Sequence, residues 1–434
     1  MEKLENSLWH PFTQQKTAPQ PIEFNKAEGS RLHTTDGRVF FDAISSWWVN
    51  TLGHCRSEIV DAVHAQFQQM DQVIFAGATH RPGQLVAKEL LRIAPEGLHK
   101  VFFSDNGSTA VEVGLKMALQ FWFNQGCAHK KRFVALRHSY HGDTFGAMSV
   151  SEPSPFNSPF PLAGFPVSYL DPPVAGRVTP ESVCEQVTAL CSQYDDIAGF
   201  IYEPMVQGAG GMHMQNPVAL EKMLETFRSH GVLCIADEVM TGFGRTGKMF
   251  ASMYTSVQPD IMCVAKGLSG GTFPIAATLA SEKIYEVFHH EDRQKAFFHG
   301  HSFTGNPLGC AAALASMKLL QSSETLASIE MISSMNQRFL EGFRDAPGRE
   351  AFKDVRACGT ILACEVDTVN QPSGYFNHLR DEIESFFLDR LIFARPLGNV
   401  VYLLPPYCSE QGQIYAFYDS VVALGESLLR KKSV

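Results

Sequence analysis

With 434 residues, the chain is longer than one hydrophobic core normally supports, so we expect two domains or one large domain with appended segments. Its 45% hydrophobic and 19% charged residues are typical of a folded globular protein. The net charge of −9, without a long basic run, argues against nucleic acid or an anionic membrane as a partner and favours small-molecule chemistry.

The N-terminus and the cysteines predict a cytoplasmic protein. Residues 2–6 carry charged and polar side chains where a secretory signal needs an apolar core, and no run of 18 apolar residues follows. The ten cysteines are scattered, without the paired spacing of a metal site or a redox motif. We therefore expect reduced thiols.

In chain order, the first predicted strand is Val39 to Ile44, and a helix follows with apolar residues at Ile59, Val63, Phe67 and Met70. From about residue 100 to 280, short apolar runs alternate with helical segments, which predicts an α/β domain with a mainly parallel sheet. The runs are Val101–Ser104, Arg132–Leu136, Ile197–Glu203, Val232–Asp237 and Ile261–Lys266, and another strand is expected over Thr272–Ala280.

Two predicted helices begin at recognisable caps. One follows Gly107 and has its first turn at Ser108-Thr109, and the other opens at Asn306-Pro307. After residue 325 we expect a helix, strands near Asp354 to Glu365, a helix to Arg390, a hairpin-like Arg395 to Tyr407 and a closing amphipathic helix. This order predicts a large domain over residues 56–325 and a smaller α+β domain built from 1–55 and 326–434.

Two of the apolar runs end in charged residues that would meet. Asp237 follows Val-Leu-Cys-Ile-Ala, and Lys266 follows Ile-Met-Cys-Val-Ala. The carboxyl ends of parallel strands share one edge of a sheet, where ligands of open α/β folds bind, so both side chains could face one ligand. Taken singly, each residue would equally suit a solvent-exposed strand end.

The segment Ser-Asp-Asn-Gly-Ser-Thr at 104–109 joins a predicted strand to a helix start. The N–H groups at a helix N-terminus bind anions such as phosphate. Gly107 would let the backbone approach closely, and Ser108 or Thr109 would add a hydroxyl donor. A simple helix cap would explain the same residues.

Flat side chains follow the strand Arg132–Leu136, where Tyr140 or His141 could stack on an aromatic ligand. A lysine, an acid, a phosphate cradle and a stacking ring are the features that pyridoxal phosphate needs from a protein. The acid keeps the ring nitrogen positive, and a desolvated lysine supplies a neutral amine. A metal is the alternative for four histidines, but they lack acidic or cysteine partners at ligand spacing, so we expect none: His138, His141, His299 and His301.

Two glycine-rich segments match other motifs. Residues 242–247 satisfy G-x-G-x-x-G, and Lys248 nearly completes a P-loop, but the next strand follows too soon for a crossover helix and Met249 replaces the Ser or Thr. We interpret this segment as a tight active-site loop around Arg245. Residues 267–271 match the G-x-S-x-G elbow of hydrolases, but a strand rather than a helix is predicted after Ser269.

Asp237-Glu238-x-x-Thr241 with the glycines at 242–247, followed by Lys266-Gly267-x-x-Gly270-Gly271, resembles the signature of class III aminotransferases. The resemblance spans nearly the whole chain. It implies a fold-type I enzyme with pyridoxal phosphate, a large domain with a mainly parallel seven-stranded sheet and a smaller α+β domain. It further implies a homodimer with active sites at the subunit interface.

Residue by residue, the resemblance implies three catalytic residues: Lys266 as the Schiff-base lysine, Asp237 on the ring nitrogen, and Tyr140 stacked on the ring. The remaining cofactor contacts would be Gly107, Ser108, His141, Val239 and Ser302 of the partner subunit. The substrate contacts would be Phe12, Trp47, Trp48, Asp143, Gly300 and Arg395, with the guanidinium of Arg395 receiving a carboxylate.

Five segments resemble, more narrowly, the branch of the family that aminates 8-amino-7-oxononanoate in biotin biosynthesis, usually with S-adenosylmethionine as donor: Trp9-His10-Pro11, Ser45–Trp48, Tyr140–Thr144, Val206–Met212 and Arg395-Pro396. Two positions depart from that pattern. Phe12 stands where tyrosine is frequent in the donor pocket, and Ser302 stands where threonine is common. Because a relative that is similar around Trp9–Gln14 and Phe297–Asn306 uses lysine, lysine is the alternative donor.

Other functions stay open at this point. An aminotransferase for ornithine, 4-aminobutyrate or β-alanine would share the core motifs but not the pair Trp47 and Trp48. A pyridoxal-phosphate mutase would need no separate acceptor, a hydrolase would depend on Ser269, and a scaffold protein would bind no cofactor.

Overall fold

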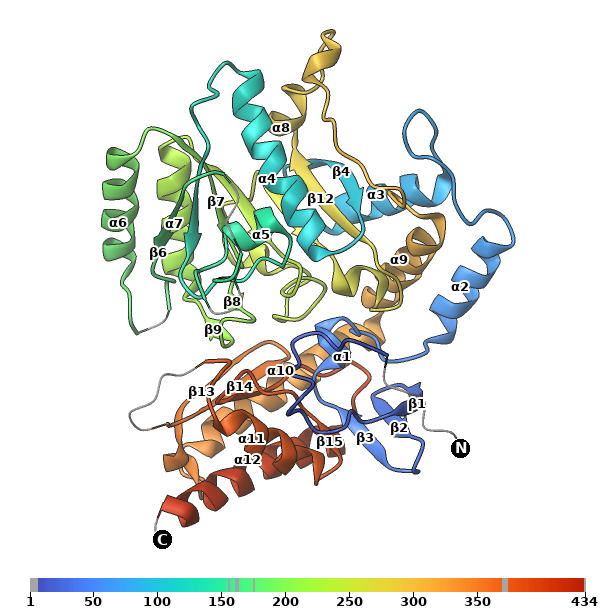
Figure 1. The fold of residues 1–434 in the computed structure, drawn as a ribbon, viewed down its shortest axis with the longest axis vertical. Helices are drawn as coiled ribbons and strands as arrows, with labels where there is room; N and C mark the ends of the chain where they lie inside the picture. The colour runs from blue at the N-terminus through green and yellow to red at the C-terminus, as the bar shows by residue number, and fades with distance from the viewer. Residues whose placement is uncertain (1–6, 155–156, 161–163, 175, 369–373, 433–434) are drawn as a thin grey trace.

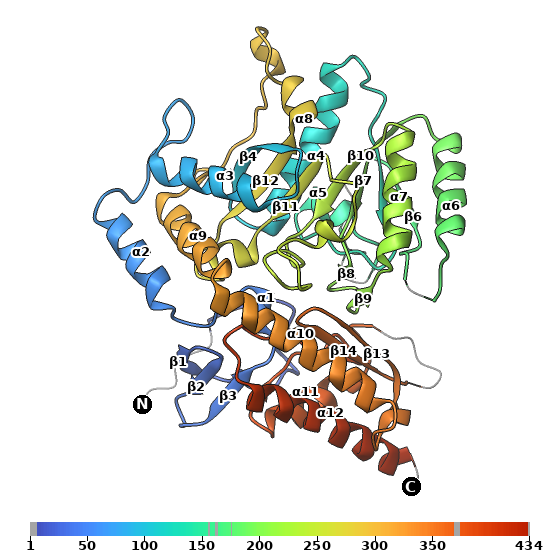
Figure 2. The same cartoon turned by 180° about the vertical axis from the view of Figure 1, so that it is seen from behind.

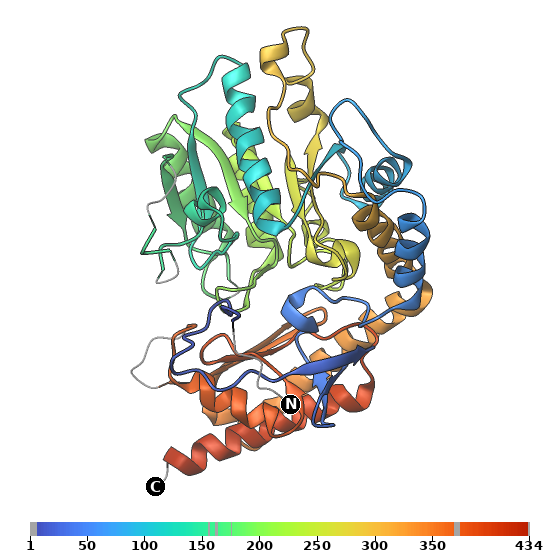
Figure 3. The same ribbon diagram turned by 45° about the vertical axis from the view of Figure 1, so that its right-hand side comes forward.

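The computed structural model describes residues 7–154, 157–160, 164–174, 176–368 and 374–432. The polar residues 2–6 considered above lie outside these ranges. The described chain forms an upper body around a large sheet and a lower body that contains both ends of the chain (Figure 1). Strands from the N-terminal segment lie beside helices from the C-terminal segment in the lower body (Figure 3).

The upper body is built on a seven-stranded sheet with the order β4-β12-β11-β10-β7-β5-β6. Only β12 runs antiparallel to its neighbours β11 and β4, so the predicted mainly parallel sheet is confirmed. β12 starts four residues later than predicted, and β6 was not predicted. The strands are β4 Leu98–Ser104, β5 Arg132–Leu136, β6 Val167–Leu170, β7 Ile197–Tyr202, β10 Leu233–Asp237, β11 Ile261–Val264 and β12 Ala276–Ser281.

The central strands are apolar without a break because both faces of the sheet are covered. In β10, Leu233 and Ile235 pack against α4, while Cys234 and Ala236 belong to the core on the opposite face. Successive side chains of a strand point to opposite faces, so a strand buried on both sides needs a continuous apolar run. This is the pattern that identified these strands in the sequence.

Helices α4, α5 and α8 cover one face of the sheet, and the other helices of the upper body lie on the opposite side (Figures 1 and 2). Several begin with a side-chain cap, and Asn306 with Pro307 opens α9 as predicted. No helix within the described ranges is long and apolar enough to span a bilayer. The helices are α2 Ser57–Phe67, α3 Arg81–Ile93, α4 Gly107–Asn124, α5 Phe145–Ser149, α6 Pro180–Gln193, α7 Pro217–Ser229, α8 Glu282–Glu286 and α9 Pro307–Leu320. The short helix α1, Ser45–Trp48, lies where the two bodies meet (Figure 1).

The lower body holds a four-stranded sheet, β1-β2-β3-β15, and a three-stranded sheet, β13-β14-β16. Three helices pack beside them (Figure 2). Its elements are β1 Phe24–Glu28, β2 Arg31–Thr34, β3 Val39–Asp42, α10 Ser323–Phe343, β13 Phe352–Cys358, β14 Ile361–Val366, α11 Leu379–Leu388, β15 Ile392–Phe393, β16 Val400–Leu403 and α12 Gln411–Lys432. A short hairpin, β8 Val206–Gln207 with β9 His213–Met214, lies at the edge of the upper body that faces these sheets.

The predicted hairpin over Arg395 to Tyr407 is wrong in its pairing. A tight turn does join Leu397 to Val400, but β15 before the turn pairs in parallel with β3. β16 after the turn pairs antiparallel with β14 in the other sheet. The chain therefore crosses between two sheets here, which local sequence cannot reveal. The pairing of β3 with β15 joins the two ends of the chain, and the boundaries proposed at residues 55 and 326 stay a prediction.

The packing of α7 against the sheet generates a test of the fold. Phe227 is fully buried and its ring stacks on Phe200 with 4.4 Å between centroids. We expect Phe227→Ala to lower the free energy of unfolding by about 3–5 kcal/mol because it removes a large core side chain. The matched control is Phe123→Ala on α4, where the ring is 65% exposed; we expect a change within about 0.5 kcal/mol. Equal losses in denaturant titrations of the two variants would contradict this account of the core.

Candidate active site

A cavity of about 910 Å³ lies at the carboxyl edge of the large sheet, where the two bodies meet. Most of the site residues predicted from the sequence belong to its lining: Phe12, Trp47, Trp48, Gly107, Ser108, Tyr140, His141, Asp143, Asp237, Val239, Lys266 and Arg395. Gly300 and Ser302 do not line this cavity and are exposed on the surface of the chain. The contact of Ser302 with the cofactor of the partner subunit and the contact of Gly300 with the substrate stay predictions.

Lys266 enters the cavity from a sharp turn of the backbone. β11 ends at Val264, two residues earlier than predicted, and Lys266 begins a short 3₁₀ turn with φ of 44°. A non-glycine residue with positive φ is uncommon and concentrates at functional sites. Its Nζ lies 4.9 Å from the centre of the Trp48 ring. Burial lowers the pKa of Lys266 to about 8, although Asp237 and Glu203 oppose this shift, so a neutral amine is accessible near neutral pH.

Asp237, the last residue of β10, is held by two donors. Its Oδ2 lies 2.7 Å from Nδ1 of His141, and its Oδ1 accepts the amide of Val239 at 3.1 Å. Both side chains are almost completely buried. The imidazole is thus oriented by Asp237, which assigns His141 to the carboxylate rather than to a stacking position. An ionised carboxylate at this place can pair with a cation in the cavity.

The start of α4 forms an anion site. The side chain of Asn106 accepts the amide of Thr109 at 3.1 Å, and the hydroxyl of Thr109 accepts the amide of Asn106 at 3.0 Å, which completes a capping box. The amides of Gly107 and Ser108 belong to the first helical turn, where the helix itself supplies no acceptor. The Ser108 hydroxyl accepts the amide of Asp143 at 3.1 Å and keeps its own proton for a ligand.

Tyr140 and Asp143 lie on the loop that follows β5. Burial raises the pKa of the Tyr140 hydroxyl well above its ordinary value, and the nearby Asp143 carboxylate adds to this shift. This phenol therefore stays protonated. Tyr140 lines the cavity, while Asp143 is exposed at its margin.

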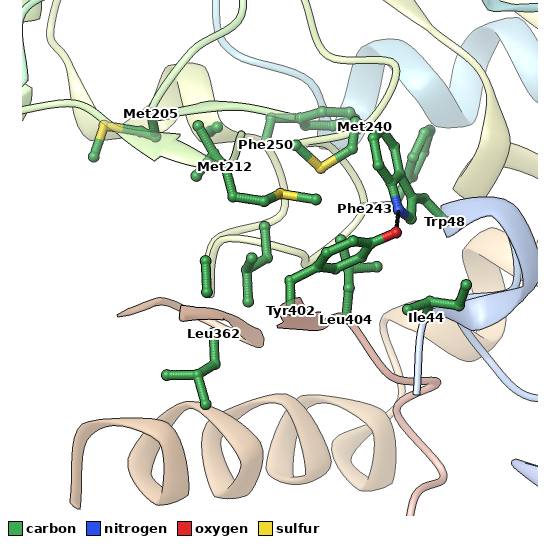
Figure 4. Close-up of a cluster of buried hydrophobic side chains, with 14 of the residues drawn as sticks. Ile44, Trp48, Met205, Met212, Met240, Phe243, Phe250, Leu362, Tyr402 and Leu404 are labelled. Carbon is green, nitrogen blue, oxygen red and sulfur yellow. Dashed lines mark hydrogen bonds between the residues drawn. The ribbon is translucent and has the colours of Figure 1, made fainter. Parts of the chain in front are cut away.

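Aromatic side chains form one wall of the cavity. Trp48 is buried, and its Nε1 donates to the hydroxyl of Tyr402 at 2.8 Å, as the dashed line in Figure 4 shows. Trp47 is 44% exposed, and Phe12 packs edge-on against it with 5.5 Å between centroids. This wall suits a chain of methylene groups.

Arg395 lies at the same wall. The carbon at the centre of its guanidinium is 5.1 Å from the centre of the Trp47 ring, and its Nη2 donates to the hydroxyl of Tyr375 at 3.1 Å. The planar fork retains further N–H donors for a carboxylate. The cavity therefore offers an anion site on the lower body as well as the one at α4.

Glu203, Tyr375 and Tyr402 are among the lining residues that sequence reasoning missed. Glu203 follows β7 directly and is buried, and burial raises the pKa of its carboxyl to about 7. A carboxylate that ends an apolar run is the signal that identified Asp237, so Glu203 could have been found in the same way. Tyr375 and Tyr402 carried no comparable signal. Arg395 and Trp48 were predicted, but their hydrogen bonds to these two tyrosines are seen only in the folded chain.

The glycine-rich segment 242–247 opens no helix, which agrees with the rejection of both nucleotide motifs. The expectation that it shapes the active site around Arg245 is wrong in one respect, because Arg245 does not line the cavity. It is 1% exposed and donates to the backbone carbonyls of Pro405 and Trp48 at 2.8 and 3.2 Å. Arg245 thus binds the backbone of Trp48 on the side that faces away from the cavity.

The hydroxyl of Ser269 binds the backbone of a nearby residue. It is buried, donates to the carbonyl of Phe273 at 2.7 Å and accepts the amide of Phe273 at 3.1 Å. No helix follows it, since the next element is β12. The elbow motif is therefore a turn between two strands.

The four histidines that had suggested a metal fall into three places. His141 contacts Asp237, and His138 lies beside Glu152 at 3.2 Å. His299 and His301 are adjacent, with 3.0 Å between their Nε2 atoms, and the Nδ1 of His301 is 2.8 Å from Asp105.

The donor set of the cavity fits pyridoxal phosphate. A desolvated lysine, an acidic side chain in contact with a histidine, and a helix N-terminus with a serine hydroxyl converge on one cavity. They match the aldehyde, the ring nitrogen and the phosphate of that cofactor.

Comparison with known proteins agrees with this geometry. The family model described as aminotransferase class-III matches residues 12–424. The adenosylmethionine-8-amino-7-oxononanoate aminotransferase of Synechococcus elongatus is 44% identical over 422 residues, covering 96% of this chain and 98% of its own. The enzyme of the same name from Geobacter sulfurreducens is 41% identical, covering 95% of this chain and 94% of its own.

Two solved structures are similar over almost their whole length. The crystal structure of adenosylmethionine-8-amino-7-oxononanoate aminotransferase from Methanocaldococcus jannaschii has a TM-score of 0.89 at 31% identity and covers 97% of each chain. A PLP-bound amine transaminase from an uncultivated Pseudomonas species has a TM-score of 0.88 at 29% identity, covering 96% of this chain and 98% of its own.

The start of α4 generates a second test. A Cβ placed on Gly107 would lie 2.6 Å from Cγ1 of Val239, so Gly107→Ala forces the helix start away from β10. We expect a loss of about 1–3 kcal/mol in the free energy of unfolding and weaker phosphate binding. The double variant Gly107→Ala/Val239→Ala should recover most of the loss. Gly412→Ala, where no atom lies within 4 Å, is the control and should leave stability unchanged. A double variant no better than the single one would contradict this contact.

Proposed function

Because the chain belongs to the class III aminotransferases, which depend on pyridoxal phosphate, we propose that it transfers an amino group to 8-amino-7-oxononanoate in biotin biosynthesis. The observation that carries the proposal is the cavity itself. It combines the cofactor-binding set with an aromatic wall and the guanidinium of Arg395. A keto acid whose carboxylate ends an aliphatic chain matches that combination.

The residues of the chain divide the work as follows. Bound pyridoxal phosphate supplies an electron sink and carries the amino group between the two substrates. Lys266 would hold the cofactor's aldehyde carbon and, as a neutral amine, would move the proton at the donor carbon. Asp237, which lies 2.7 Å from Nδ1 of His141, would keep the ring nitrogen protonated. Gly107 and Ser108 would hold the phosphate, and Tyr140 would provide the stacking ring.

The substrate side is lined by apolar and charged groups. Trp47 and Trp48 contact the methylene chain, and Arg395 binds the carboxylate. Asp143 lies at the margin of the cavity, where its negative charge suits the amino group that the keto acid already carries.

The proposed donor is S-adenosylmethionine, as the names of the similar enzymes indicate for those proteins. Phe12 is the observation that favours lysine as the alternative. Its ring packs on Trp47 and offers no hydroxyl, so a polar contact to the donor that a tyrosine would make is absent at this position.

We further propose a cytoplasmic homodimer with its active sites at the subunit interface. Gly300 and Ser302 belong to an exposed segment that also presents the side chains of Phe298 and Phe303, which are 75% and 63% exposed. A surface of this kind favours contact with a second copy. All ten cysteines are free thiols, which suits a reducing compartment.

The proposed function is tested with a panel of amino donors and 8-amino-7-oxononanoate as acceptor. We expect turnover with S-adenosylmethionine, and in Lys266→Ala we expect loss of turnover and of the absorbance band of the lysine-bound cofactor. If lysine supports turnover and S-adenosylmethionine does not, lysine is the donor. Activity only on ornithine, 4-aminobutyrate or β-alanine would refute the proposed acceptor, and an active Lys266→Ala enzyme would refute the mechanism.

Arg395 generates a separate prediction. Removing a charged partner of a carboxylate costs about 1.5–3 kcal/mol, so Arg395→Ala should raise KM for the keto acid about 10- to 100-fold and KM for the donor much less. The control is Arg380→Ala, whose guanidinium lies 5.2 Å from the centre of the Tyr375 ring but outside the cavity lining. It should change KM for the keto acid less than threefold, or about 0.6 kcal/mol. Equal effects of Arg395→Ala on both substrates would remove Arg395 from its proposed role.

A further inference from the structure

Glu203 is a buried acid in the active-site cavity to which the chemistry above gives no role. It follows the last residue of β7 and is 5% exposed, and it lines the cavity together with Asp237 and Lys266. Carboxylates are seldom buried without a purpose, because desolvation of the charge is costly.

The carboxyl group of Glu203 holds two loops at once. Its Oε1 accepts the amide of Gly208 at 2.9 Å, and its Oε2 accepts the amide of Tyr140 at 3.4 Å. These amides belong to segments that follow β8 and β5, so the acid at the end of β7 connects the loop after the neighbouring strand β5 with the hairpin of β8 and β9.

Each of the two loops carries or supports an aromatic side of the cavity. Tyr140 is the residue proposed to cover the cofactor ring. A Cβ placed on Gly208 would lie 3.1 Å from the Trp48 ring, so this tryptophan rests directly on the backbone that Glu203 binds. Moving the carboxyl would therefore move both aromatic groups.

Glu203 also contributes charge to the cavity. The ionisable groups that face it are Asp237 on β10, His141 and Tyr140 on the loop after β5, and Lys266 after β11. Burial raises its pKa to about 7, His141 favours its ionised form and Asp237 opposes it. Once ionised, Glu203 raises the pKa of Lys266, second only to Asp237 in this direction.

We propose that Glu203 is a positioning residue: its carboxyl holds Tyr140 and, through Gly208, Trp48 in place, and its negative charge stabilises the protonated form of the nitrogen of Lys266. This inference deepens the proposed function and rests on the role given there to Lys266.

The charge is tested by the variant Glu203→Gln, which keeps the size of the side chain. The readout is the pH midpoint of the absorbance change of the lysine-bound cofactor in the holoenzyme. Removing a negative charge disfavours the protonated nitrogen, so we expect the midpoint to fall by about one pH unit. A folded, coloured Glu203→Gln enzyme with the wild-type midpoint would overturn the proposal. If the role of Lys266 itself were wrong, Lys266→Ala would keep the absorbance band of the lysine-bound cofactor and its pH dependence, so the two failures are distinguishable.

The contacts are tested by Glu203→Asp, which keeps the charge but shortens the side chain by one methylene group. We expect the wild-type midpoint with a dissociation constant for pyridoxal phosphate raised about tenfold, because the bonds to Tyr140 and Gly208 are lost. A midpoint lowered by about one unit in Glu203→Asp would contradict the electrostatic role, and unchanged cofactor affinity would contradict the positioning role. This variant also decides the question if Glu203→Gln fails to fold.

Glu238 provides the matched control. It is fully buried and next to Asp237, but it lies outside the cavity lining and binds Thr241 and the amides of Ala251 and Ser252. We expect Glu238→Gln to lower the thermal unfolding temperature and to leave the midpoint unchanged. A midpoint shift as large as that of Glu203→Gln would show a general effect of losing a buried carboxylate and would overturn the specific role.

Discussion

The active site depends on keeping one amine out of water beside buried acids. Desolvation favours the neutral form of Lys266, while Asp237 and Glu203 favour the charged form. The pKa of about 8 is the balance of these opposing effects. That balance requires the ends of three neighbouring parallel strands to meet at one edge of the sheet, since β7, β10 and β11 deliver Glu203, Asp237 and Lys266 to the same cavity. The lower body covers this edge of the sheet, since Tyr375, Arg395 and Tyr402 line the same cavity.

The backbone that carries the aromatic wall of the cavity is strained and is held in place by its surroundings. Ser46 and Trp48 both have positive φ, as does Lys266 opposite them. Such conformations are unfavourable by about 1–3 kcal/mol each and persist only where the surroundings enforce them. Here Arg245 binds the carbonyl of Trp48 from behind, and Tyr402 accepts its indole N–H. The wall is therefore formed before a substrate arrives, with the orientation of Trp48 determined by groups from the middle and the C-terminal part of the chain.

Apolar runs and motifs in the sequence predicted those strands and site residues whose signal lies within a short segment of the chain. β5 matches its predicted range, Arg132–Leu136, because a strand buried on both faces must be continuously apolar. β6 was missed because three of its four residues are only partly buried, so its apolar signal is weak. The pairing of β15 with β3, and the contact of Trp48 with Tyr402, join segments more than 300 residues apart and leave no local trace. The cavity residues that were predicted follow strand ends or match a family motif, whereas Glu203 also follows a strand end and was overlooked.

The single antiparallel strand of the large sheet has a further consequence. Parallel neighbours must be joined by a connection that crosses the sheet, but antiparallel neighbours need only a return at the same edge. Because β12 runs back beside β11, the chain between them remains at the carboxyl edge, and Thr272, Phe273, Pro274 and Ile275 line the cavity there. A change of side-chain size in this return therefore alters the space left for a substrate without altering the order of the strands.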